Sequence, residues 1–96
     1  MKHIIKTTKE KIMYEVEADT FKDAIIQLIK EKKSLRYADF TGTNLRGADF
    51  RGADFTGTNL RGANLRDADF RDADFRGASL KDADFRDADL KGAIFE

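Results

Sequence analysis

The 96-residue chain has no cysteine, no proline and no tryptophan, and it has a single histidine. The lack of cysteine excludes disulfides, cysteine-based zinc sites and a thiol nucleophile, and it predicts a protein of a reducing compartment, the cytoplasm. His3 lies near the chain terminus, so we expect an ordinary strand residue rather than a metal ligand or a catalytic group. The sequence therefore predicts no metal and no cofactor.

Long hydrophobic runs and a strong net charge are also absent. The start, MKHIIKTTKEKIMYEV, breaks into charges after two isoleucines, so it predicts neither a signal peptide nor a membrane span. The 18 basic and 18 acidic residues cancel, with nine and six in residues 1–37 against nine and twelve in residues 38–96. Neither imbalance is large enough to indicate a partner. Since no phosphate-binding loop and no paired nucleophile and base appear, we expect no enzyme.

What the chain does contain is a repeat with a period of five residues, as in ADFRGADFTGTNLRGANLRDADFRDADF at residues 48–75. Phe or Leu recurs at twelve positions, every fifth residue from 40 to 95, and ten of the residues two positions earlier are Ala. An amphipathic helix repeats apolar residues every three to four positions, and a half-buried strand every two. A period of five therefore predicts a chain that turns a corner once per unit.

Four such units close a square coil of 20 residues, so that residues 20 apart stack inside it. Phe55, Phe75 and Phe95 are then expected to form one interior column, and Phe50, Phe70 and Leu90 another. Only residues as small as Ala fit between the columns, because larger ones overpack the coil.

The corners need backbone angles that Gly adopts at little cost. Gly occupies the corner position in seven units, and Asp takes it at 67, 72, 82 and 87. Because Asp also bonds its neighbouring backbone, the later corners are expected to use a different turn type.

The units Ala-Asp-Phe-Arg-Gly and Ala-Asn-Leu-Arg-Asp resemble those of the pentapeptide repeat proteins. This resemblance implies a mainly β fold, a right-handed quadrilateral β-helix of about three coils, over residues 35–96. Residues 1–34 then form a separate N-terminal segment. The hexapeptide β-helix of acyltransferases requires a period of six and does not fit.

In that N-terminal segment, residues 12–18 place an apolar residue at every second position and predict a strand with one apolar face, which pairs with residues 3–7. The connection TKEK lacks the usual residues of a tight hairpin. Asp19 or Thr20 is expected to begin a helix whose apolar residues follow helical spacing: Phe21, Ala24, Ile25, Leu28 and Ile29. Because an open coil needs a cap, this ββα segment is expected to close the N-terminal mouth. The alternative is a separate, basic binding head.

Charged side chains recur on the outside of the expected coil. Three columns with members 20 residues apart are predicted: Asp49, Asp69 and Asp89; Arg46, Arg66 and Arg86; and Arg51, Arg71 and Lys91. The acidic column, with members roughly 4.8 Å apart, is in principle able to hold a cation. Because basic columns lie on both sides of it, we expect an exposed ion-pair lattice instead, with each pair worth about 0–1 kcal/mol.

The last unit departs from the repeat, because Ile94 stands where the other units have Asp, Asn or Ser. Leu90, Ile94 and Phe95 are therefore expected to expose an apolar surface, and such surfaces mark association. We expect a two-fold homodimer through the last coil. Related gyrase-directed proteins of the family also dimerise through their C-terminal coils.

The expected function is that of a non-enzymatic, rigid protein–protein interaction module whose partner the sequence does not identify. Some family members resemble duplex DNA and bind DNA gyrase, so the alternative is a DNA-mimicking inhibitor or protector of such an enzyme. Three coils rise about 14 Å, over which B-DNA carries about eight charges, whereas residues 38–96 have a net charge of minus three. We expect no direct nucleic-acid binding, because the Phe residues belong to the interior.

Overall fold

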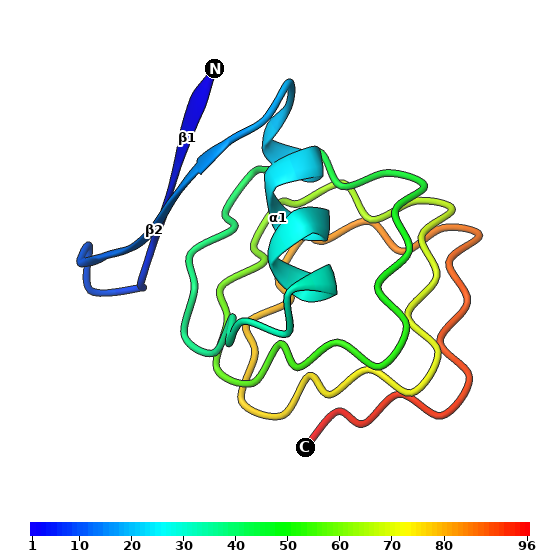
Figure 1. The fold of residues 1–96 in the computed structure, drawn as a ribbon. Helices are drawn as coiled ribbons and strands as arrows, with labels where there is room; N and C mark the ends of the chain where they lie inside the picture. The colour runs from blue at the N-terminus through cyan, green and yellow to red at the C-terminus, as the bar shows by residue number, and fades with distance from the viewer.

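The computed structural model describes residues 1–96 and begins with an antiparallel strand pair, β1 (Lys2–Lys6) and β2 (Ile12–Glu17), followed by the helix α1 (Phe21–Lys30). The remaining chain winds as a four-sided coil, with α1 lying across its mouth and the hairpin to one side (Figure 1). The helix has ten residues, whereas a bilayer requires about 20. No helix of this chain is therefore long and apolar enough to span a membrane.

The hairpin closes without glycine. The strands pair from Lys2 with Glu17 to Lys6 with Ile12, with one irregularity between Ile5 and Lys6. At the tip, Glu10 adopts a left-handed φ of 64°. The Thr7 hydroxyl accepts hydrogen bonds from the backbone N–H groups of Lys9 and Lys11, at 3.2 and 3.1 Å. These hydrogen bonds to a side chain stabilise the turn, although TKEK lacks the residues typical of a tight hairpin.

Helix α1 begins and ends with recognisable caps. Thr20 is the N-cap residue, and its hydroxyl accepts a hydrogen bond from the backbone N–H of Asp23 at 3.0 Å. At the other end Lys32 has a left-handed φ of 59°, and Lys33 N–H donates to the Leu28 carbonyl at 3.0 Å. This is a Schellman-type end with lysine in the place that glycine usually takes. The buried residues Ala24, Ile25 and Leu28 belong to the predicted apolar stripe.

The coil has the predicted period of 20 residues. Isolated parallel bridges join residues 20 apart throughout, from Asp39 with Asn59 to Asp74 with Ile94. Each side is held from both directions: Phe50 N–H donates to Asp69 C=O at 2.8 Å, and Asp69 N–H donates to Ala48 C=O at 2.9 Å. Because every side pairs with the side one coil further on, the coil has the hydrogen bonding of parallel strands without long strands.

Stacked aromatic rings fill the interior as the repeat predicts. The ring centroids of Phe55 and Phe75 lie 5.4 Å apart with an interplanar angle of 11°, and those of Phe75 and Phe95 lie 5.1 Å apart with an angle of 7°. Phe50 and Phe70 form a second stack at 5.3 Å. The small residues between the stacks are buried in the first coils: Ala38, Ala48, Ala53, Ala63, Ala68 and Ala73.

All the corners turn in the same region of backbone space. The corner glycines have φ between 67° and 78°, and Asp67, Asp72, Asp82 and Asp87 have φ between 60° and 62°. The φ angles of the Asp corners are therefore close to those of the Gly corners, contrary to the expectation of a different turn type. Asp is among the few non-glycine residues that adopt this left-handed conformation readily, which explains why it substitutes for Gly here.

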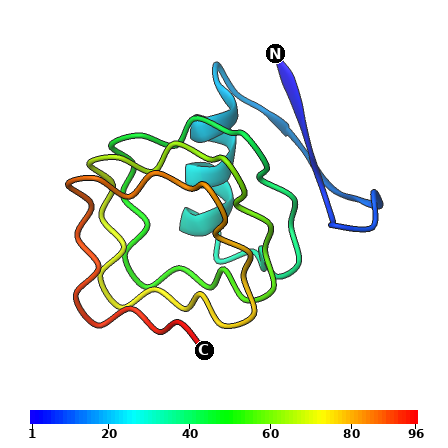
Figure 2. The same cartoon turned by 180° about the vertical axis from the view of Figure 1, so that it is seen from behind.

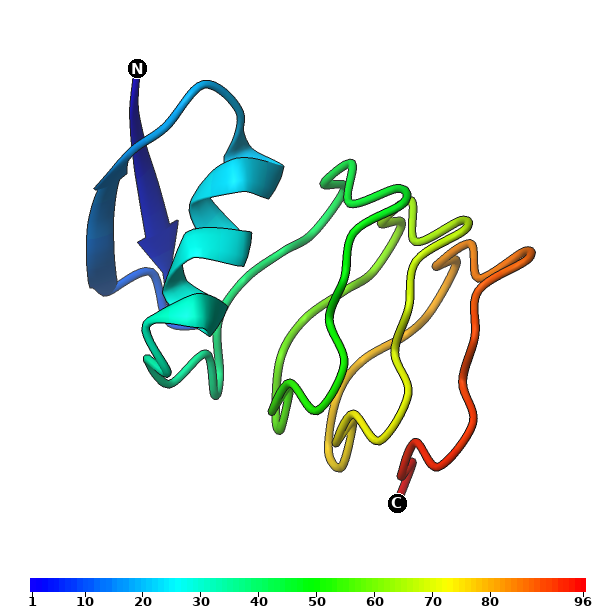
Figure 3. The same cartoon turned by 45° about the vertical axis from the view of Figure 1, so that its right-hand side comes forward.

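The N-terminal elements pack on the first coil (Figure 3). Asp39 N–H donates to Lys6 C=O at 2.7 Å, which continues the hairpin onto one side of the coil. On α1, Phe21 contacts Phe40 edge to face, with ring centroids 6.2 Å apart. A single cluster of buried residues extends from Ile5 to Phe75. The division between residues 1–34 and 35–96 stays a prediction, because one core runs through both.

Candidate interaction surfaces

The face of the last coil exposes apolar side chains. Phe95 is 47% exposed and Ile94 is 44% exposed, whereas Phe75, one coil earlier, is only 2% exposed. Leu80, Phe85 and Leu90 are partly buried, although the equivalent residues in the preceding coil are fully buried. Seen from behind, the last coil is the nearest layer, and no other segment lies over it (Figure 2). Leu90, Ile94 and Phe95 thus lie together on one end of the molecule.

The same face presents unpaired backbone groups. In the preceding coil, the N–H groups of Leu60, Leu65 and Phe70 each donate to a carbonyl of the last coil, at 2.8 Å. The equivalent N–H groups of Leu80, Phe85, Leu90 and Phe95 have no backbone acceptor. The end of the coil is therefore an open β-edge around an apolar centre, a combination that favours association.

Arginine and aspartate form a continuous ladder on one side of the coil. Arg51 Nη2 lies 2.9 Å from Asp49 Oδ2, and Arg71 Nη2 lies 2.7 Å from Asp69 Oδ2. Longer contacts of 3.7 Å join Arg51 to Asp69 and Arg71 to Asp89. The predicted acidic column thus pairs with the column of Arg51 and Arg71, in which each Arg follows its Asp partner by two residues.

The column Arg46, Arg66 and Arg86 does not pair with that acidic column. Arg46 Nε lies 3.0 Å from the corner residue Asp67, and Arg86 Nη2 lies 2.6 Å from Asp84 in its own unit. Arg66 has a buried Nε without a hydrogen-bond partner. The reason is geometric: a carboxylate accepts the backbone N–H of the residue two positions later, as Asp84 does from Arg86 at 3.1 Å, and this leaves it beside that residue's side chain.

A family model described as pentapeptide repeats (8 copies) matches residues 34–72 and 59–96. The chain belongs to the pentapeptide repeat family. Its β-helix is therefore the fold that the resemblance implied. The comparison with curated proteins gave no match.

Three solved structures of pentapeptide repeat proteins resemble this chain. Rfr23 from the cyanobacterium Cyanothece 51142 is 30% identical, with a TM-score of 0.58, over 60% of this chain and 40% of its own. The protein alr5209 from Nostoc PCC 7120 is 33% identical over 76% of this chain and 74% of its own, with a TM-score of 0.32. HetL, involved in heterocyst differentiation regulation in Nostoc sp. strain PCC 7120, is 29% identical over 66% and 40%, with a TM-score of 0.30. The chain thus spans two fifths of the length of Rfr23.

Two outward carboxylates of the pentapeptide repeats have strongly lowered pKa values. The Arg76 side chain donates to Asp74 from Nε and Nη2 at 3.0 and 2.6 Å, and the Arg76 backbone N–H donates at 3.0 Å. These hydrogen bonds lower the pKa of Asp74 to about 2. Arg86 does the same for Asp84, whose pKa is also about 2.

The lowered pKa values predict acid sensitivity with a defined sign. A carboxylate with a pKa near 2 in the folded protein and about 3.9 in the unfolded chain stabilises the fold above pH 4. That stability is lost as the pH falls from about 4 to 2. We expect the urea midpoint to decrease over this range, and to decrease less in the double variant Arg76→Gln/Arg86→Gln. An equal decrease in both proteins would contradict the assignment.

The chain has no group of three or more His, Asp or Glu side chains that could hold a metal ion. His3 lies in β1, and its Nε2 is 3.2 Å from the carbonyl oxygen of Ala18. The ring therefore links β1 to the residue that follows β2.

Two residues at the start of the coil were not singled out from the sequence. Arg36 Nε donates to Asp54 at 2.7 Å, and Tyr37 occupies a corner position with a left-handed φ of 66°. The Tyr37 ring covers Gly57, so closely that a Cβ at Gly57 would lie 2.5 Å from it. The signal available in the sequence was the spacing, since Tyr37 stands 20 residues before the corner residue Gly57.

Proposed function

We propose that this chain is a non-enzymatic, rigid interaction module that associates through the exposed face of its last coil. The observation that carries the proposal is the contrast between Phe95, nearly half exposed, and the buried Phe75 directly beneath it. Ring stacking and parallel pairing hold this face on a rigid support. A rigid support favours binding, because little conformational freedom is lost on association.

At the opposite end, the hairpin and α1 act as a cap. They cover the first coil through backbone pairing at Lys6 and Asp39 and through the Phe21–Phe40 contact. Capping elements protect the apolar interior and the open edge of a repeat coil. The hairpin and α1 cover the apolar interior at this end, whereas the last coil leaves it open, so the proposed self-association is directional.

The occupant that we propose for the last coil is a second copy of the chain, related by a two-fold axis. Leu90, Ile94 and Phe95 then meet the same residues of the other protomer. The two shorter extents of the molecule are 25 and 24 Å. An end face of that size buries on the order of 600 Å² per protomer, which is near the lower limit for a specific interface. The dimer is therefore expected to be weak and to depend on concentration.

Replacing Phe95 with aspartate is expected to give a monomer, because a charge would be buried at the centre of the interface. The control is Ile12→Asp, which adds the same charge at a 59% exposed position on the hairpin. Sedimentation at increasing concentration should give twice the chain mass of 10.9 kDa for the parent and the control. A single-chain mass for the parent at every concentration, or an unchanged mass for Phe95→Asp, would refute the dimer.

The alternative, a DNA-mimicking inhibitor or protector of an enzyme such as gyrase, needs a surface with unbalanced negative charge. The ladder from Asp49 to Asp89 is neutralised by Arg51 and Arg71, and Asp74 and Asp84 are neutralised by Arg76 and Arg86. This pairing favours the interaction module over the mimic. Binding to gyrase that weakens steeply with salt would reverse that preference.

A further inference from the structure

A groove separates α1 from one corner of the first coil. It consists of two adjoining cavities of about 540 and 360 Å³, which share Ile29 and Arg51 in their walls. One wall is the C-terminal half of α1 with Ile26, Ile29 and Lys30, and the other is the segment Asp49–Asp54 of the coil. We call this space the helix–coil groove. It lies at the opposite end of the molecule from the last coil.

The coil side of the groove is an open β-edge. The N–H groups of Asp49 and Asp54 and the carbonyls of Asp49, Arg51 and Asp54 have no backbone partner. One coil further on, the equivalent groups are all paired: Asp69 N–H donates to Ala48 C=O, and Gly52 N–H donates to Arg71 C=O. The hairpin covers the edge only near Asp39. Two short stretches of edge, around Asp49 and around Asp54, meet at the corner Arg51–Gly52 and are thus free to pair with another chain.

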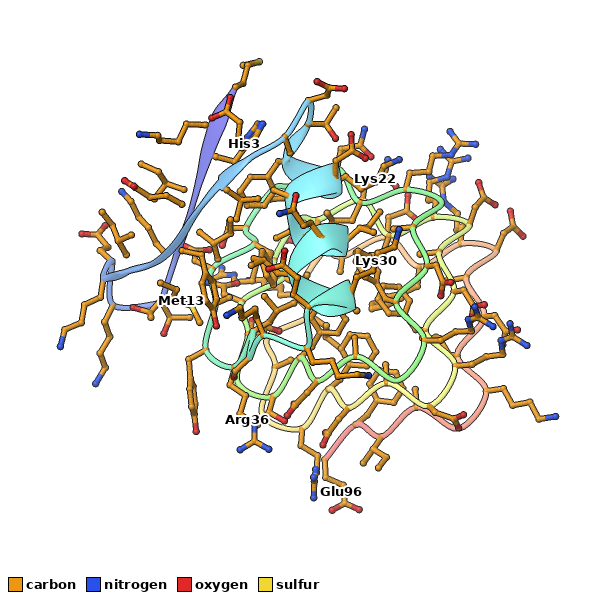
Figure 4. All side chains as sticks on the ribbon, viewed as in Figure 1. His3, Met13, Lys22, Lys30, Arg36 and Glu96 are labelled. Carbon is orange, nitrogen blue, oxygen red and sulfur yellow. The ribbon has the colours of Figure 1, made fainter.

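The walls of the groove carry an excess of positive charge. Arg36 and Arg51 are paired with Asp54 and Asp49, at 2.7 and 2.9 Å. Three further cations line the same cavities and form no ion pair: Lys30, Lys32 and Lys33. Figure 4 shows Lys30 on α1 and Arg36 where the chain enters the coil. The unpaired ammonium groups favour an acidic ligand.

We propose that the helix–coil groove binds an acidic segment of another protein, which pairs with the edge at Asp49 and Asp54 and bends with the coil at the corner between them. Its backbone takes the hydrogen bonds that a preceding coil would make, and alternate side chains face opposite sides. The acidic side chains contact Lys30 and Lys33, and apolar ones contact the half-buried Ile26 and Ile29. This surface goes beyond the proposed dimer and does not depend on it.

The test is fluorescence polarisation with a labelled hexapeptide, acetyl-Asp-Val-Glu-Leu-Asp-Val-amide, and the full chain. We expect saturable binding that becomes about tenfold weaker in the variant Lys30→Glu/Lys33→Glu. The matched control is Lys9→Glu/Lys11→Glu, which makes the same charge change at the hairpin tip and should bind as the parent does. All four lysines are exposed, so neither variant is expected to unfold.

Two further probes separate the proposal from general attraction of anions. A backbone N-methylated form of the hexapeptide keeps the charges but loses strand pairing, and we expect about tenfold weaker binding. Equal binding of the methylated peptide would refute strand addition, as would no saturable binding of the parent peptide. A DNA duplex that competes more strongly than the peptide, with the same dependence on Lys30 and Lys33, would refute a peptide ligand in favour of a nucleic acid.

Discussion

Replacing Phe70 with alanine is expected to lower the free energy of unfolding by about 3–5 kcal/mol, as measured by urea denaturation. Phe70 is fully buried, and its ring lies 5.3 Å from Phe50, 5.1 Å from Phe75 and 5.8 Å from Phe85. The cavity would lie at the junction of both interior stacks, where the hydrogen-bonded coils above and below have little freedom to collapse. Because small domains are stable by only about 5–15 kcal/mol, much of the fold's stability depends on this ring.

The matched control for this substitution is Phe95→Ala, measured below the concentration at which the chain associates. Phe95 is the Phe of the last coil that stacks on Phe75, and it is 47% exposed. Its loss should cost well under half as much as the loss of Phe70, because little of its surface is removed from water in the monomer. Equal losses for the two substitutions would mean that the last coil is covered even in the monomer.

Replacing Gly57 with alanine should produce the second large effect, about 2–5 kcal/mol. Part of it is the cost of a left-handed φ of 70° for a residue with a Cβ, about 1–2 kcal/mol. The rest arises because the new Cβ would lie 2.5 Å from the Tyr37 ring. Thermal or urea unfolding of the variant measures the total.

Two further variants separate the backbone cost from the cost of the contact with Tyr37. Gly62 has a similar φ of 67° but no neighbouring atom within 4 Å, so Gly62→Ala should show the backbone cost alone. Removing the ring in Gly57→Ala/Tyr37→Ala should eliminate the extra cost relative to Tyr37→Ala. If Gly57→Ala and Gly62→Ala destabilise equally, the contact between Tyr37 and Gly57 does not constrain the corner.

The interior was predictable from the sequence because one rule applies in every unit. A period of five with a 20-residue coil places Phe55 over Phe75 and leaves room only for small residues such as Ala68 beside them. The hydrogen-bond partners follow from the same spacing, as for Phe50 with Asp69. Helix α1 was equally predictable, since its cap Thr20 and its apolar stripe are local signals.

The pairing of charged side chains on the surface was less predictable, because spacing alone does not determine the direction of a side chain at a corner. Of the two basic columns expected beside Asp69, only that of Arg71 pairs with it, since the Arg71 backbone N–H, at 3.1 Å, draws the carboxylate toward its own unit. The helix–coil groove could not be predicted from the sequence either. It depends on how α1 lies across the first coil, and no repeat position encodes that placement.

Amide hydrogen exchange at low and high protein concentration tests most directly whether the chain associates through its last coil. The N–H groups of Leu80, Leu90 and Phe95 have no backbone acceptor within the chain. We predict that their exchange slows as the concentration rises, while the equally unpaired N–H of Asn44 at the other end of the coil is unaffected. Fast exchange of the last-coil amides at both concentrations would contradict the account.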